Sequence, residues 1–155
     1  MVINELLAAN DSGLQDEDGD RSDWIELHNT TAEAVDLTGW RLTDDQSAPS
    51  KWTFPAVSIP AGDYLLVFAS GKDRAVAGQP LHANFSLNRA GEYLALVDPA
   101  GTIQDVLAPF PEQLADVSFG LGVAATGEEP LVGEQHPVRV PHTCPTRRAG
   151  EALRA

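Results

Sequence analysis

Short apolar runs separated by turn residues recur along the first 120 residues of the chain. Gly, Pro, Asn or Asp interrupts these runs about every 8–12 residues, a spacing typical of antiparallel sandwiches and barrels. The best helical candidate, residues 112–115, is one turn at most and too short to hold by itself. The pattern therefore predicts an all-β fold. The predicted strands are Val2–Leu7, Trp24–His28, Val35–Leu37, Trp40–Leu42, Lys51–Phe54, Val57–Ile59, Tyr64–Ala69, Phe85–Leu87, Tyr93–Val97, Thr102–Val106 and Val117–Gly120.

Two of these runs indicate how the strands are covered. In Trp24–His28 apolar and polar residues alternate, so Ile25 and Leu27 share one face while Trp24, Glu26 and His28 share the other. The run Tyr64–Ala69 is apolar throughout, which favours an interior strand covered on both faces.

The length of 155 residues leaves room for one ordinary domain. We expect residues 1–120 to form it. Beyond residue 121 the pattern gives way to Gly, Pro and small residues, so residues 121–155 are predicted to be a poorly patterned C-terminal extension with room for one closing strand.

The charge balance limits the classes of partner that the protein can bind. Ten Lys and Arg stand against 23 Asp and Glu, a formal charge of −13. Because attraction to phosphate drives nucleic-acid affinity, this charge disfavours nucleic acid, and it equally disfavours anionic lipid. No apolar run is long enough to insert into a membrane. The first residues begin a strand pattern at once, so we expect no signal peptide within this sequence, and export would depend on a segment outside it.

Ten short motifs follow one another along the chain: Ile3–Leu6, Asp16–Asp20, Asp23–Asn29, Asp36–Leu42, Lys51–Pro55, Ile59–Gly62, Phe68–Gly71, Asn84–Leu87, Gly91–Glu92 and Asp98–Gly101. In this order they resemble the lamin tail domain, an immunoglobulin-like module that also occurs widely in exported bacterial proteins. The resemblance covers roughly residues 1–120 and implies an immunoglobulin-like antiparallel β-sandwich. It also implies a non-catalytic accessory module of a larger exported bacterial protein, located outside the cell or on its surface.

The segment from residue 11 to residue 23 is the main candidate for a metal site. It contains six acidic residues against Arg21 alone, and such crowding costs repulsion unless a cation relieves it. Calcium suits an irregular loop because it accepts six to eight oxygen ligands in flexible geometry. We therefore predict calcium ligands among four aspartates, with a solvated acidic loop that binds nothing as the alternative. The candidate ligands are Asp16, Asp18, Asp20 and Asp23.

The three tryptophans could form an exposed stacking platform or belong to the core. Each lies in a strand-like run, and the family resemblance makes Trp40 and Trp52 core-like. Trp24 shares its face with Glu26 and His28, so we expect it to be the most exposed of the three.

No segment of the sequence matches a catalytic motif in full. Residues 69–73 lack the first Gly of a phosphate loop, and Asp73 stands where a Ser or Thr is required. We predict no enzymatic activity.

Three functions remain open after these exclusions. The first is binding to a protein partner, to a cell surface or to the rest of the parent chain, through loops and exposed sheet edges that accept an added strand. The second is targeting of a carbohydrate or nucleic acid substrate. The third is a metal-dependent hydrolase that uses the acidic loop.

Overall fold

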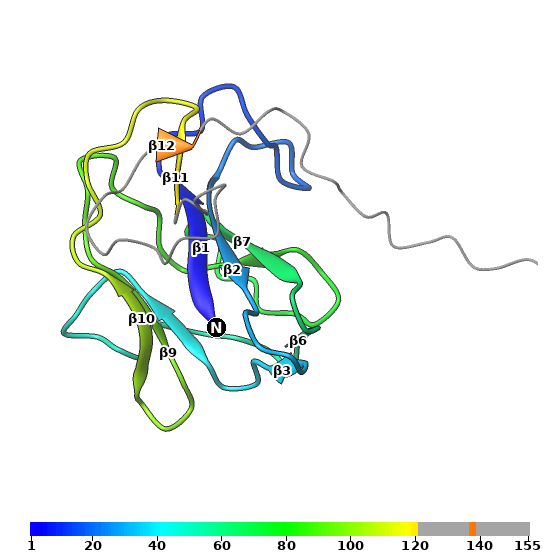
Figure 1. The fold of residues 1–155 in the computed structure, drawn as a ribbon. Coiled ribbons are helices and arrows are strands. Elements are labelled where there is room, and N and C mark those ends of the chain that lie inside the picture. The colour runs from blue at the N-terminus through cyan, green and yellow to red at the C-terminus, as the bar shows by residue number, and fades with distance from the viewer. Residues whose placement is uncertain (121–136, 139–155) are drawn as a thin grey trace, which may run out of the picture.

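The computed structural model describes residues 1–120 and 137–138, which fold into largely antiparallel sheets packed as a β-sandwich (Figure 1). The rest of the predicted extension 121–155 lies outside the described residues. The predicted all-β class is confirmed. The strands are β1 (Val2–Leu7), β2 (Asp23–His28), β3 (Val35–Asp36), β4 (Arg41–Thr43), β5 (Trp52–Thr53), β6 (Ser58–Ile59), β7 (Tyr64–Ala69), β8 (Leu81–His82), β9 (Leu94–Val97), β10 (Ile103–Leu107), β11 (Ser118–Gly120) and β12 (Pro137–Val138).

Two sheets enclose the core and a small third sheet lies at one end. The six-stranded sheet has the order β12-β11-β1-β2-β7-β8, and the four-stranded sheet has the order β10-β9-β4-β5. The third sheet pairs β3 with β6. Alternation along each strand directs one set of apolar side chains inward, so that Ile25, Leu27 and Val67 of the larger sheet share a single core with Leu42 and Leu96 of the smaller one.

Trp40 and Trp52 both pack in or against the core, as the family resemblance implies. Trp52 is 2% exposed and packs edge-on against Phe54. Trp40 is partly buried and packs against the same core. Trp24 is partly exposed on the outward face of β2.

The predicted strand Phe85–Leu87 is not a strand. This segment forms only an isolated bridge between Ser86 and Ser70, whereas β8 pairs with β7 in parallel. Phe85 and Leu87 are nevertheless buried while the residues between and beside them are exposed. The alternation that suggested a strand therefore reflects two core side chains supplied by an irregular segment.

The prediction that β7 is covered on both faces is correct only at its C-terminal end. Phe68 points outward and is buried, in contact with the ring of His82. Tyr64 also points outward, at the other end of the strand, and is 52% exposed. The apolar run thus leaves part of the outer face open to solvent.

Candidate functional site

The acidic loop between β1 and β2 curls around the carboxylate of Asp16. Asp16 Oδ1 accepts hydrogen bonds from the backbone N–H groups of Asp18 and Asp20, both at 3.0 Å. Asp16 Oδ2 accepts a further bond from Ser22 Oγ at 2.9 Å. Gly19 closes the turn with a φ of 85° and donates its N–H to the Asp16 carbonyl. Asp16 therefore organises the loop from inside.

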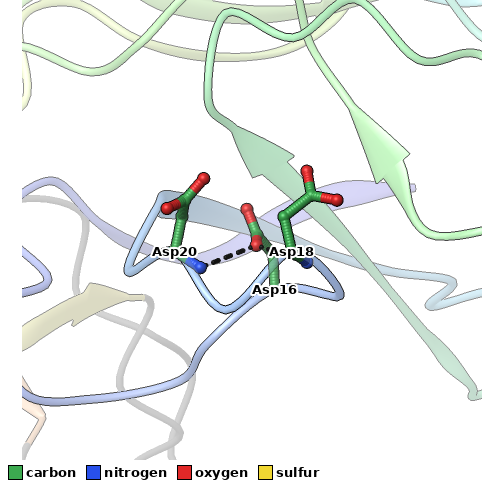
Figure 2. A group of neighbouring side chains, drawn as sticks. All are labelled: Asp16, Asp18 and Asp20. Carbon is green, nitrogen blue, oxygen red and sulfur yellow. Dashed lines mark hydrogen bonds between the residues drawn. The ribbon is translucent and has the colours of Figure 1, made fainter.

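Three of the four predicted metal ligands come together. One carboxylate oxygen from each of Asp16, Asp18 and Asp20 lies within 4.8 Å of the others. Figure 2 shows these carboxylates on one side of the loop, with the bond from the Asp20 N–H to Asp16. Asp23 is not part of this group. Its carboxylate, at the start of β2, accepts backbone hydrogen bonds from Asn10 and Leu87.

Lys72 holds the three carboxylates together. Its Nζ lies 2.6 Å from Asp16 Oδ2, 2.8 Å from Asp18 Oδ2 and 2.9 Å from Asp20 Oδ2. The side chain of Asp16 is fully buried, that of Lys72 is largely buried, and that of Asp20 is mostly exposed. We call Lys72 and these three aspartates the lysine clasp.

Charge pairing in the clasp outweighs the cost of burial. Burial opposes ionisation of Asp16, but the hydrogen bonds from Lys72, Ser22 and the loop backbone prevail and lower its pKa to about 2. Burial likewise disfavours the charged form of Lys72, yet the three carboxylates raise the pKa of its ammonium. Asp16 and Lys72 are therefore both charged near neutral pH.

A second set of polar contacts ties the same loop to β8. Arg74 donates to Glu17 and contacts Asp18, each at 2.7 Å. Glu17 also lies 2.9 Å from Nε2 of His82, a fully buried side chain whose Nδ1 is 2.8 Å from Ser70 Oγ. These contacts satisfy both nitrogens of the buried imidazole.

The order Ser70–His82–Glu17 has the connectivity of a nucleophilic triad, but the surroundings favour a structural role. The ring is sealed from solvent and stacks on Phe68 with centroids 5.0 Å apart. Ser70 Oγ also accepts the backbone N–H of Lys72 at 3.3 Å, which ties the hydroxyl to the turn after β7. We assign a structural role to this series of hydrogen bonds, which is to hold the acidic loop against the sheet.

The sequence analysis missed Lys72, Arg74 and His82 as partners of the acidic loop. The available signal was charge: two basic residues follow the predicted strand Tyr64–Ala69 directly, and an acidic block precedes Trp24–His28. Opposite charges of this kind pair if the two strands are neighbours.

The donor set fits an ammonium ion in its present geometry. A calcium ion shared by the same three carboxylates would compete for the position held by Lys72 Nζ and would need further oxygen ligands, since calcium takes six to eight. The calcium prediction therefore stays a prediction, with Lys72 as the competing cation.

The outer face of β1, β2 and β7 is the second candidate site. Paired residues across these strands point to the same side, in three rows. The row nearest the acidic loop is largely buried, and the other two are partly or mostly exposed. Each row takes one residue from β1, one from β2 and one from β7. Starting nearest the acidic loop, the first row is Leu7, Trp24 and Phe68, the second is Glu5, Glu26 and Leu66, and the third is Val2, His28 and Tyr64.

An aromatic pair and a carboxylate pair dominate the two exposed rows. The rings of His28 and Tyr64 stack with centroids 4.3 Å apart and an angle of 11° between their planes. Glu5 and Glu26 lie opposite each other in the β1–β2 ladder. Burial raises the pKa of Glu5, and the neighbouring charge of Glu26 adds to this, although a hydrogen bond from Ser118 opposes it.

The edge strand β10 is a poor template for an added strand. A register shift between Ile103 and Asp105 interrupts its ladder with β9. The Asp105 carboxylate accepts the N–H of Ile3 at 2.7 Å and that of Val106 at 2.8 Å. A β-bulge and an acidic side chain on an edge strand both oppose strand addition.

Comparison with known proteins supports the family resemblance independently of the short motifs. A family model described as Lamin Tail Domain matches residues 1–110. A search of curated proteins found no match. Among the residues that the structure describes, no helix has the length and apolar composition needed to cross a membrane.

Proposed function

The chain belongs to the lamin tail domain family, and from that premise we propose that it is a non-catalytic, protein-binding accessory module of a larger exported bacterial protein. The family consists of non-enzymatic immunoglobulin-like domains that commonly serve protein interaction. The proposed location outside the cell or on its surface rests on the exported bacterial proteins in which other members of the family occur.

One observation carries the binding role: the sandwich exposes aromatic and apolar side chains on the outer face of β1, β2 and β7. Ile25, Leu27 and Val67 fill the inner face of the same strands and are fully buried. Tyr64 is 52% exposed on the outer face, Leu66 is partly exposed in the next row, and Trp24 is partly exposed in the row beyond that. Aromatic side chains are enriched in protein interfaces, and this face combines them with partly exposed apolar surface and the Glu5–Glu26 pair.

The lysine clasp supports a structural task for the acidic loop. It fixes the loop at the end of the sheet where Asp23 pairs with Ala69, next to the row that contains Trp24 and Phe68. Calcium is the alternative stabiliser, and a metal-dependent hydrolase would require the same carboxylates to hold a metal with an open position.

Site-specific photocrosslinking tests the binding role. A benzoylphenylalanine at Tyr64 is compared with one at Thr53, an exposed position on β5 in the four-stranded sheet. Both proteins are incubated with the secreted and cell-surface proteins of the source organism. We expect discrete crosslinked protein products from position 64 and none from position 53.

Two outcomes would overturn the proposal. One is the same set of products, or none, from both positions. The other is metal-dependent hydrolysis of phosphodiester or peptide substrates that Asp16→Asn abolishes, because such activity would make the domain an enzyme.

A further inference from the structure

We propose that the outer face of β1, β2 and β7 binds a basic peptide segment, with a lysine or arginine side chain paired to Glu5 and Glu26 beside Tyr64. This inference rests on the proposed function and names the chemistry of the partner. Three features of the face lead to it: a carboxylate pair that makes no ion pair within residues 1–120, the sign of the overall charge, and a rigid aromatic surface.

The carboxylate pair has neutral neighbours. Glu5 and Glu26 are cross-strand partners, and like charges directly opposite each other destabilise a sheet. Asn4 Nδ2 donates to Glu26 Oε1 at 2.8 Å, and Ser118 Oγ donates to Glu5 Oε1. Within residues 1–120, no ion pair reaches either carboxylate. A cation placed between them would relieve the repulsion.

The chain does not place that cation on the strands themselves. The strands β1, β2 and β7 contain no lysine or arginine. The basic residues after β7, Lys72 and Arg74, are already paired with the acidic loop. With a net charge of −13, the protein attracts a basic partner and repels an acidic one. Charge complementarity thus selects a lysine- or arginine-bearing ligand.

The aromatic surface explains why the ligand is a peptide rather than a free cation. Tyr64 lies flat against His28, so its ring is held in place and loses little entropy on binding. Leu66 lies in the same row as the carboxylate pair and adds partly exposed apolar surface. An arginine or lysine can pair its charged end with the carboxylates while its own stem, or a neighbouring apolar side chain, packs on Tyr64.

Calorimetric titration of the full chain tests the inference. The probe is the acetylated, amidated peptide Leu-Arg-Tyr-Arg-Leu, and its partner control replaces both arginines with glutamine. We expect measurable binding of the arginine peptide that weakens as salt rises, and at least tenfold weaker binding of the glutamine peptide. Glu26→Gln and Tyr64→Ala should each weaken binding of the arginine peptide about fivefold to tenfold.

A matched variant separates this site from general attraction. Glu112 is exposed and lies outside the three strands, so Glu112→Gln removes the same charge and should leave affinity unchanged. Circular dichroism and urea midpoints establish that each variant is folded.

Three results would overturn the inference: no binding of the arginine peptide, equal binding of the glutamine peptide, or equal weakening by Glu112→Gln and Glu26→Gln. If crosslinks still form at position 64, the proposed function stands and only the basic chemistry of the partner is wrong. If neither crosslinks nor peptide binding appear, both proposals fail.

Discussion

Asp23 at the start of β2 lies directly opposite Ala69 at the end of β7 in their antiparallel ladder. This pairing brings the loop before β2 and the turn after β7 to the same end of the sheet. The acidic block of the first and the basic residues of the second therefore meet, although Lys72 and Asp16 are separated by 56 positions along the chain. The register of two strands thus creates the lysine clasp.

Removing the clasp cation should destabilise the fold. In Lys72→Met the buried Asp16 carboxylate loses its ion pair but keeps its bonds to the loop backbone and Ser22. We expect the free energy of unfolding at pH 7 to fall by about 2 kcal/mol. Urea denaturation measures it. Arg21→Met, which removes an exposed positive charge from the same loop, should change stability by less than about 0.5 kcal/mol. Equal effects of the two substitutions would contradict the clasp.

The same variant tests the calcium prediction. If the ammonium of Lys72 already serves the three carboxylates, millimolar calcium should leave the melting temperature of the wild-type chain unchanged. In Lys72→Met the vacated position becomes available, and calcium at about ten times its dissociation constant should raise the melting temperature by about 3 °C. Adding Asp18→Asn should remove that rise. A rise in the wild-type chain that Asp18→Asn abolishes would show instead that calcium displaces Lys72.

Local patterns in the sequence were sufficient to predict most strands. Tyr64–Ala69 appears with the predicted bounds because its apolar run is itself the strand. Val2–Leu7 also appears as predicted, because apolar residues lie at both of its ends. Leu81–His82 was missed because two residues carry no periodicity and their strand state depends on pairing with β7. Phe85–Leu87 was wrong because alternating burial also occurs in an irregular segment that feeds the core.

The residues of the candidate site differ in the same way: some are positioned by local sequence and others by the pairing of distant strands. Asp16, Asp18 and Asp20 belong to one short turn, so their convergence follows from local spacing. Lys72, Arg74 and His82 come from segments more than 50 positions away, and the β2–β7 and β7–β8 pairings bring them there. Asp23 was grouped with the loop by sequence proximity, but its place in β2 directs it to backbone groups of Asn10 and Leu87.

Asp23 should make the protein more stable at mildly acidic pH. Burial raises the pKa of its carboxyl to about 6, against hydrogen bonds from Leu87 and Asn10 that oppose the shift. The unfolded chain ionises this group near pH 4, so the folded state binds the extra proton between about pH 6 and pH 4. Stability should therefore rise as pH falls from 7 to 5, by about 1–2 kcal/mol from this group.

Comparison with Asp23→Asn measures that contribution. Urea denaturation at pH 7 and pH 5 should show a smaller gain for the variant than for the wild-type chain. Some gain should remain, because burial also raises the pKa of Glu5 and of Glu92. The opposite lowering of the Asp16 pKa to about 2 acts only at lower pH, where protonation of Asp16 removes stability. Identical pH slopes for wild type and variant would contradict this assignment.

Gly91 should tolerate no side chain, whereas Gly19 should tolerate one at moderate cost. Both have positive φ values, 91° and 85°. A Cβ at Gly91 would lie 2.2 Å from the carbonyl oxygen of Phe110, a residue whose side chain belongs to the core, so the backbone itself must move. A Cβ at Gly19 would have no neighbour within 4 Å. We expect Gly91→Ala to lower the free energy of unfolding by about 3 kcal/mol or more, and Gly19→Ala by about 1 kcal/mol.

Urea denaturation of the two variants provides the comparison, and each acts as the other's control because the strain from positive φ is shared. Failure of Gly91→Ala to fold, alongside a folded Gly19→Ala, would agree with the expected order. Gly19 closes the turn of the lysine clasp. Lys72→Met should therefore lower the free energy of unfolding less in the Gly19→Ala background than in the wild-type chain, because the turn that positions the three aspartates is loosened. Equal losses at positions 91 and 19 would show that the close approach of Phe110 does not limit position 91.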